Sequence, residues 1–138
     1  LKNERPDRKK SAIKSLEALC EECEKEYRIK TTFDYELGDK EIPDAIWEVI
    51  LDNTFEAVTN SLKHSGCDSL SIKIKVLGEV VRCVISDNGR GAERIEDGMG
   101  IQGMKKRVRN VKGFFDIESN AGFTINMILP ITGKNSLS

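Results

Sequence analysis

The order of the elements expected along this chain predicts an α+β protein. We expect a two-layer α/β sandwich, with a mixed, mostly antiparallel sheet of about five strands and three helices on one face. Two segments, 11–27 and 43–65, carry apolar residues at helical spacing. Two pairs of alternating segments, within 69–87 and 113–130, are typical of β-hairpins. A chain of 138 residues can bury the core of one such domain.

The first helix follows a polar lead. Residues 1–10 are highly charged and contain Pro6, so we expect a linker there. Apolar residues then recur at helical spacing from Ile13 to Tyr27, and Ser11 is the expected N-cap. Residues 29–38 alternate and are rich in Thr, Phe and Tyr, which predicts a strand that ends at Gly38.

The second helix is the longest. Pro43 fits its first turn and Gly66 its C-terminal stop. Apolar side chains step by three or four residues and predict one buried face, made of Trp47, Leu51, Phe55, Val58 and Leu62.

The remaining elements are two hairpins and a short helix between them. Segments 69–78 and 79–87 alternate on either side of Gly78 and Glu79, which predicts the first hairpin. The basic segment 101–111 predicts a short helix. Two more strands, within 113–119 and 122–130, are expected to join at Asn120 and Ala121, and the polar residues after Pro130 to be loose.

Composition narrows the classes of partner. The net charge is −1, from 22 basic and 23 acidic residues, so there is no global attraction to nucleic acid or to an anionic membrane. No apolar run approaches the roughly 18 residues of a membrane span.

Cys20 and Cys23 have the spacing of a metal or redox pair, but Cys67 and Cys83 do not complete a zinc set, so we expect reduced cysteines. The first residue is Leu1, which suggests a piece of a longer protein.

Polar residues follow one face of the long helix. Glu56, Asn60 and Lys63 form a stripe, with Asp52 one turn earlier and His64 at the end. An amide and an acid one turn apart can approach one Mg²⁺, which keeps several waters and takes other ligands from phosphates. A lysine can meet a phosphate as a point charge. An alternative explanation is that the stripe is an ordinary solvent-exposed face of the helix. His64 would then only cap the C-terminal end, where a positive charge is favoured.

Glycines gather after the second strand of the first hairpin. Asp87 ends that strand, and Gly89 and Gly91 follow. A carboxylate buried at a strand end needs a strong donor, such as the exocyclic amine of adenine. Glycine lets the backbone approach a planar base. An alternative explanation is a plain turn after the strand, in which Gly89 and Gly91 supply positive φ.

A second glycine group leads into the short helix. Its sequence is GMGIQGM, residues 98–104. Backbone amides at a helix N-terminus form an anion site that suits phosphates, and Lys105 and Arg107 would add positive charge. The polar segment 92–97 between the two glycine groups is a candidate flap over a nucleotide.

These motifs, in this order, resemble the ATP-binding catalytic domain of a sensor histidine kinase, within the GHKL superfamily. EAVTNSLKH (56–64) is similar to the N box, DNGRG (87–91) to the G1 box and GMGIQGM (98–104) to the G2 box. NAGFTINMILP (120–130) is similar to the final strand, although the usual Gly–Thr pair is here Gly122-Phe123-Thr124. The short loop and GMGIQGMKKRV are most similar to kinases that pair with helix-turn-helix response regulators. The resemblance implies a Bergerat fold.

The resemblance also implies a role for each matching position. Glu56, Lys63 and His64 would take part in catalysis, Glu56 through a water and the other two next to the phosphates. Asn60 would bind Mg²⁺ and ATP, and Asp87 the adenine amine. The other positions implied in ATP binding are Gly89, Gly91, Gly98, Met99, Gly100, Ile101, Lys105 and Thr124.

The implied organisation is a linker from an upstream dimerisation domain (1–10), a histidine-kinase-like ATPase domain (11–131) and a flexible tail (132–138). The implied cofactors are ATP and Mg²⁺. The partners would be the upstream phosphoacceptor domain and, through the full kinase, a response regulator, with no nucleic acid or direct membrane contact. We expect a monomeric, cytoplasmic fragment. The sole histidine, His64, lies in the N box, so the phosphoacceptor histidine would lie elsewhere. Two alternatives stay open: a free-standing anti-sigma-factor serine kinase, and a non-catalytic nucleotide-sensing module.

Overall fold

The structure is a computed structural model, and it describes residues 7–89, 100–119 and 121–132. The described residues form three helices and a five-stranded sheet, in the order α1 (Arg8–Tyr27), β1 (Lys30–Glu36), α2 (Asp44–His64), β2 (Ser69–Leu77), β3 (Val80–Asp87), α3 (Ile101–Asn110), β4 (Phe114–Glu118) and β5 (Phe123–Pro130). Every predicted element is present. The α+β sandwich is therefore confirmed.

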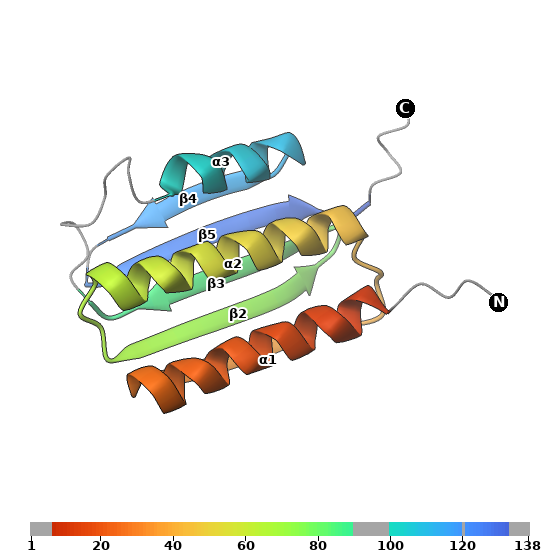
Figure 1. Ribbon diagram of the computed structural model, residues 1–138. Coiled ribbons are helices and arrows are strands. Elements are labelled where there is room, and N and C mark those ends of the chain that lie inside the picture. The colour runs from red at the N-terminus through yellow and green to blue at the C-terminus, as the bar shows by residue number, and fades with distance from the viewer. Residues whose placement is uncertain (1–6, 90–99, 120, 133–138) are drawn as a thin grey trace.

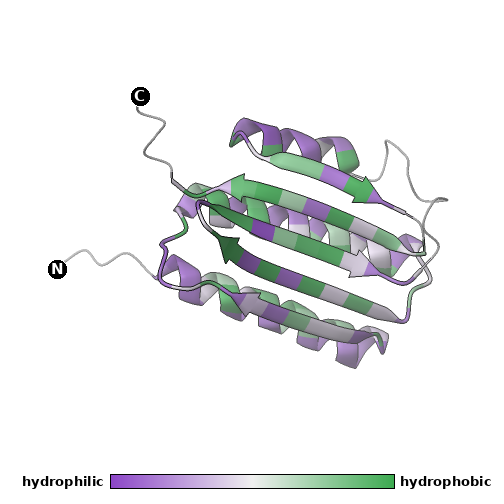
Figure 2. Cartoon of the chain, turned by 180° about the vertical axis from the view of Figure 1, so that it is seen from behind, coloured by the Kyte–Doolittle hydropathy of each residue, from purple (hydrophilic) through white to green (hydrophobic). Residues whose placement is uncertain are grey.

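The sheet is mixed, with the strand order β1-β2-β3-β5-β4. β1 pairs in parallel with β2, and the other three pairings are antiparallel. The three helices lie on one face of the sheet (Figure 1). Seen from behind, the described strands present their other face with no described helix over it (Figure 2).

The hydrophobic core lies between the sheet and the helices. Alternate residues of each central strand point into it, as the period of two in a β-strand requires. In β3 these residues are Val81, Cys83 and Ile85, followed by Asp87 as the last inward position. The same alternation in β5 buries Phe123, Ile125, Met127 and Leu129.

The first helix begins earlier than the sequence predicts. It starts at Arg8, and the side chain of Asp7 accepts a hydrogen bond from the backbone N–H of Lys10. Ser11 is therefore not the N-cap; its hydroxyl donates to the carbonyl of Arg8 inside the first turn. The helix therefore starts three residues before Ser11, because an aspartate earlier in the chain supplies the capping oxygen.

The buried face of α2 is rotated from the predicted one. Trp47 and Val58 are buried as expected, but Phe55 is 40% exposed. The helix instead turns inward a set that includes three polar residues, namely Ile46, Trp47, Val49, Ile50, Asn53, Thr54, Ala57, Val58 and Ser61. Counting apolar letters alone misses this face, because the polar members of it find partners on other elements.

The four cysteines form no disulfide bonds. Burial raises the pKa of Cys83 to about 12, and a hydrogen bond with Thr54 partly opposes that rise. Burial also raises the pKa of Cys20 to about 11, helped by the neighbouring Cys23. Among the described residues, no helix has both the length and the apolar character needed to cross a membrane.

Candidate functional site

Three elements bring the predicted site residues together. The C-terminal half of α2, the end of β3 and the start of α3 lie toward one end of the molecule (Figure 1). α2 and α3 pack against each other and, as Figure 1 shows, run in opposite directions. Glu56 of α2 lies against Gly100, the N-cap of α3.

Asp87 is the buried acid of the site, with only 7% of its surface exposed. The hydroxyl of Ser61 on α2 donates to its Oδ2 at 2.5 Å, and the backbone N–H of Gly89 donates to its Oδ1 at 2.8 Å. These donors stabilise a charge that would otherwise be costly to bury. They also fix the plane of the carboxylate, which is what a group that reads a flat base requires.

Gly89 also has a structural reason to be glycine. A Cβ at this position would collide with the backbone and side chain of Ser65, the residue that caps α2. The hydroxyl of Ser65 in turn donates to the carbonyl of Ser61 at 2.9 Å. Glycine here lets the turn after β3 pack against the end of α2, and so brings Asp87 and Ser61 together.

The neighbouring Asn88 has a structural role. Its Oδ1 accepts from the backbone N–H groups of Asp68 and Ser69, at 3.0 and 3.1 Å. Its Nδ2 donates to the carboxylate of Asp68 at 2.7 Å. Asn88 thus ties the end of β3 to the start of β2 beside Asp87.

The polar stripe of α2 divides into an inner and an outer part. Glu56 and Asn60 are half-buried, whereas Lys63 and His64 are exposed at the end of the helix. Asp52 is also exposed, so Glu56 is the acid of this stripe that approaches α3. The carboxylate of Glu56 lies where a Cβ of Gly100 would be. Asn60 lies one turn further along the same face of α2.

The N-terminus of α3 has the features of an anion site. Its N-cap is Gly100, at φ +79°, and within the described part of the chain no side chain caps the helix. The first N–H groups of a helix lack partners inside it and attract phosphate. Lys105 is half-buried in the second turn, whereas the side chain of Ile101 is buried in the core. Ile101 can therefore contribute through its backbone.

The structure does not bring Thr124 to Asp87. The hydroxyl of Thr124 lies 2.8 Å from that of Ser86, its partner across β3 and β5. Strand alternation puts these two hydroxyls on the sheet face opposite the helices, because Asp87 and Phe123 occupy the inward positions. Gly91, Gly98, Met99 and the candidate flap 92–97 lie outside the described residues.

Sequence reasoning missed Ser61, Ser65 and the role of Asn53. All three are completely or almost completely buried on α2 or at its cap. A signal was present, because Ala57, Ser61 and Ser65 recur at a spacing of four on the inward side of the helix. A polar residue in such a row needs a partner.

The residues fit ATP and Mg²⁺. A buried, oriented carboxylate would accept from the adenine amine, and the uncapped end of α3 would hold phosphates. The amide oxygen of Asn60 is a hard ligand of the kind that Mg²⁺ takes alongside water and phosphate. The donor set therefore matches a nucleotide with its metal. A helix-on-sheet sandwich with such a site defines an ATP-binding domain.

Comparison with known proteins shows the family. Residues 54–133, more than half of the chain, match the family described as histidine kinase-, DNA gyrase B- and HSP90-like ATPase. The chain belongs to this family. The predictions of an ATP-binding domain of the histidine kinase type and of its fold are confirmed.

Among curated proteins, the chain is similar to sensor kinases of Bacillus subtilis (strain 168). It is 30% identical to the sensor histidine kinase LnrJ over 126 residues, which cover 90% of this chain and 32% of LnrJ. It is 36% identical to the signal transduction histidine-protein kinase/phosphatase DegS over 73 residues, which cover 49% of this chain and 19% of DegS. The chain thus spans a third or less of the length of these relatives.

Solved structures show the same fold. The catalytic domain of the histidine kinase ThkA superposes with a TM-score of 0.69 at 17% identity, covering 90% of this chain and 92% of that one. The histidine kinase AdeS of Acinetobacter baumannii gives a TM-score of 0.63 at 14% identity, covering 90% of this chain and 65% of that one.

Proposed function

We propose that this domain positions Mg²⁺-ATP for transfer of the γ-phosphoryl group to a histidine on a separate dimerisation domain of the same sensor kinase. A response regulator would receive the group next. One observation carries the proposal: α2 joins the two ends of the site, because its Ser61 donates to the buried carboxylate of Asp87 while its Glu56 lies against Gly100, the N-cap of α3. This arrangement can hold the base, metal and phosphates of one nucleotide.

Different residues would hold the base and the phosphates of the nucleotide. Asp87, supported by Ser61 and Gly89, would hold the adenine. The N–H groups of α3 and the ammonium of Lys105 would hold the phosphates. Phosphoryl transfer depends mainly on such alignment and on charge neutralisation, so the domain needs no nucleophile of its own.

Asn60 and Glu56 would hold the metal side of the site. The amide oxygen of Asn60 would bind Mg²⁺ directly, and the carboxylate of Glu56 would orient a metal-bound water. Mg²⁺ would supply neutralisation of the charge that develops on the phosphates. Lys63 and His64, exposed at the end of α2, would approach the terminal phosphate from the solvent side.

The location of the only histidine supports a phosphoacceptor on another domain. His64 is the last residue of α2 and belongs to the proposed site itself. The similarity to LnrJ and DegS, which are much longer kinases, supports the same conclusion. We further propose a cytoplasmic location for the domain.

Labelled ATP and the full-length kinase test the proposal. Incubation with Mg²⁺ and [γ-³²P]ATP should label a residue of the full-length protein with an acid-labile, alkali-stable phosphate, whereas the isolated chain should remain almost unlabelled. Asn60→Ala should abolish labelling, and Asp52→Asn, a change at an exposed acid of the same helix, should not.

The chemistry of the label separates the alternatives. An acid-stable phosphate on a serine of a partner protein would replace the proposal with a serine kinase. ATP binding without any labelling of the full-length dimer would replace it with a nucleotide-sensing module.

A further inference from the structure

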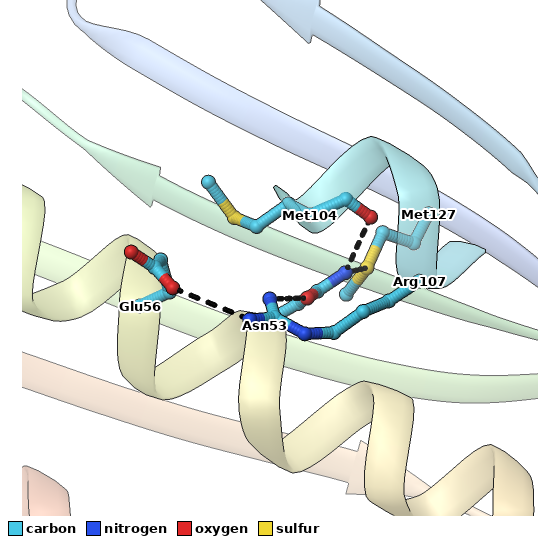
Figure 3. Close-up of polar contacts among 5 residues, drawn as sticks. All are labelled: Asn53, Glu56, Met104, Arg107 and Met127. Atoms are coloured by element: carbon cyan, nitrogen blue, oxygen red, sulfur yellow. Dashed lines mark hydrogen bonds and ion pairs between the residues drawn. The ribbon is translucent and has the colours of Figure 1, made fainter. Parts of the chain in front are cut away.

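Asn53 is a polar residue on the most deeply buried side of α2, with no exposed surface. Its Nδ2 donates to the backbone carbonyl of Met104 on α3 at 3.2 Å and lies 3.3 Å from the sulfur of Met127 on β5. Its Oδ1 accepts from the guanidinium of Arg107 at 2.8 Å (Figure 3). Both ends of this amide are therefore satisfied by residues that lie far away in the sequence.

The guanidinium of Arg107 links Asn53 to Glu56. One nitrogen, Nη1, donates to Asn53, and the other, Nη2, lies 3.6 Å from Oε1 of Glu56 (Figure 3). A guanidinium is a planar fork, so a hydrogen bond on one arm fixes the direction of the other. Asn53 thereby sets where the positive charge meets the carboxylate.

Glu56 is held between Arg107 and the first turn of α3. Its Oε1 faces the guanidinium, and its Oε2 lies against Gly100 in the space that a Cβ would fill. The side chain of Glu56 is 34% exposed, so the helix surface alone would leave it several rotamers. The contacts to α3 select one of them.

We propose that Asn53 is a positioning residue for the metal side of the nucleotide site. It acts through Arg107, holding the carboxylate of Glu56 in one place against the N-terminus of α3. The proposal rests on the proposed function, because it concerns the carboxylate that would orient a water on Mg²⁺. It also explains why an amide occupies a position on α2 where an apolar side chain would pack.

The Mg²⁺ dependence of nucleotide affinity tests this role. The dissociation constant for ATP is measured by calorimetric titration of this chain, once with Mg²⁺ and once with EDTA. The readout is the value in EDTA divided by the value in Mg²⁺, which states how much the metal strengthens binding. Asn53→Leu removes the contacts of the amide with Met104, Met127 and Arg107 and keeps the volume. Loss of packing alone would raise both dissociation constants by the same factor and leave their ratio unchanged.

We expect Asn53→Leu to lower the ratio by about two- to fivefold, a modest effect because the pair that it releases is about one-third exposed. Arg107→Met should lower the ratio by the same factor, and it serves if Asn53→Leu does not fold, since the side chain of Arg107 is 37% exposed whereas Asn53 is fully buried. The double variant should be no worse than either single one. Asp52→Asn is the matched control and should leave the ratio unchanged.

A Glu56→Gln background separates this proposal from the one on which it rests. If Glu56→Gln lowers the ratio and Asn53→Leu adds nothing to it, the positioning role is supported. If Glu56→Gln lowers the ratio while Asn53→Leu and Arg107→Met leave it unchanged, the positioning role is overturned and the proposed function stands. If Glu56→Gln itself leaves the ratio unchanged, the role of Glu56 is wrong, and the inference about Asn53 falls with it.

Discussion

Replacing Asp87 with asparagine tests the adenine side of the site with little change in shape. The amide must keep its oxygen toward the N–H of Gly89, because its NH₂ there would place two donors face to face. Its NH₂ then meets the hydroxyl of Ser61, which can rotate and accept. The turn around Asp87 is therefore preserved, and the main loss is the charged acceptor for adenine.

The magnitude follows from that loss. A hydrogen bond to a charged group contributes about 1.5–3 kcal/mol, which corresponds to about a 10- to 150-fold weaker dissociation constant. The carboxylate is only 7% exposed, so water does not replace the missing acceptor. We expect the upper part of this range in calorimetric titration of Asp87→Asn with Mg²⁺-ATP.

Inosine triphosphate supplies the internal control, because it carries a carbonyl oxygen in place of the adenine amine. The unaltered chain should prefer ATP strongly, and Asp87→Asn should lose most of that preference. Asp116→Asn, at an exposed acid of β4, should change neither affinity. An Asp87→Asn protein that melts normally and binds ATP within about twofold of the unaltered chain would refute the assignment.

Three further predictions concern the metal, the turn into α3 and the core. Asn60→Ala should remove the strengthening of ATP binding by Mg²⁺ without lowering the melting temperature; a full Mg²⁺ effect in titration would contradict the metal role. Gly100→Ala should lower the free energy of unfolding by about 1–2 kcal/mol or more in urea, because φ is +79° and the new Cβ would meet Glu56. Cys83 keeps its proton in the folded chain up to about pH 12, whereas an ordinary thiol loses it near 9.0, so stability should fall as pH rises between these values. That fall should be shallower in Cys83→Ala. If the free energy of unfolding, measured in urea at a series of pH values, falls equally with pH in both proteins, this thiol does not titrate as described.

The sequence predicts the elements well because local patterns determine them. The hairpin turn at Gly78 has φ +62°, as its position between two alternating segments requires. The long helix runs from Asp44 to His64, directly after the predicted proline and two residues before the predicted glycine. The family is also predictable from the sequence, because the helix with Glu56 and Asn60 comes first and the two glycine groups follow it in the order typical of the family.

The support of the site could not be predicted, because its contacts join residues distant in the chain. Ser61 and Asp87 are 26 positions apart, and Asn53 and Arg107 are 54 apart. The local pattern shows that a polar residue on the inward side of this helix needs a partner, but it does not show which distant residue that partner is. The same limit explains the error at Phe55, which is excluded from the core by the polar residues that enter it.

The first described helix and the last described strand have a consequence for work with this domain. The start of α1 lies at the end of the sheet that carries the Gly78 turn (Figure 1), and so does Ile131, whose N–H donates to the carbonyl of Glu79. Asp87 lies at the opposite end of β3, roughly 25 Å away for an eight-residue strand. A fluorophore or surface anchor attached to an exposed residue at the start of α1 therefore lies at the end of the sheet opposite Asp87, the proposed adenine acceptor, so the domain can be immobilised there and titrated with nucleotide.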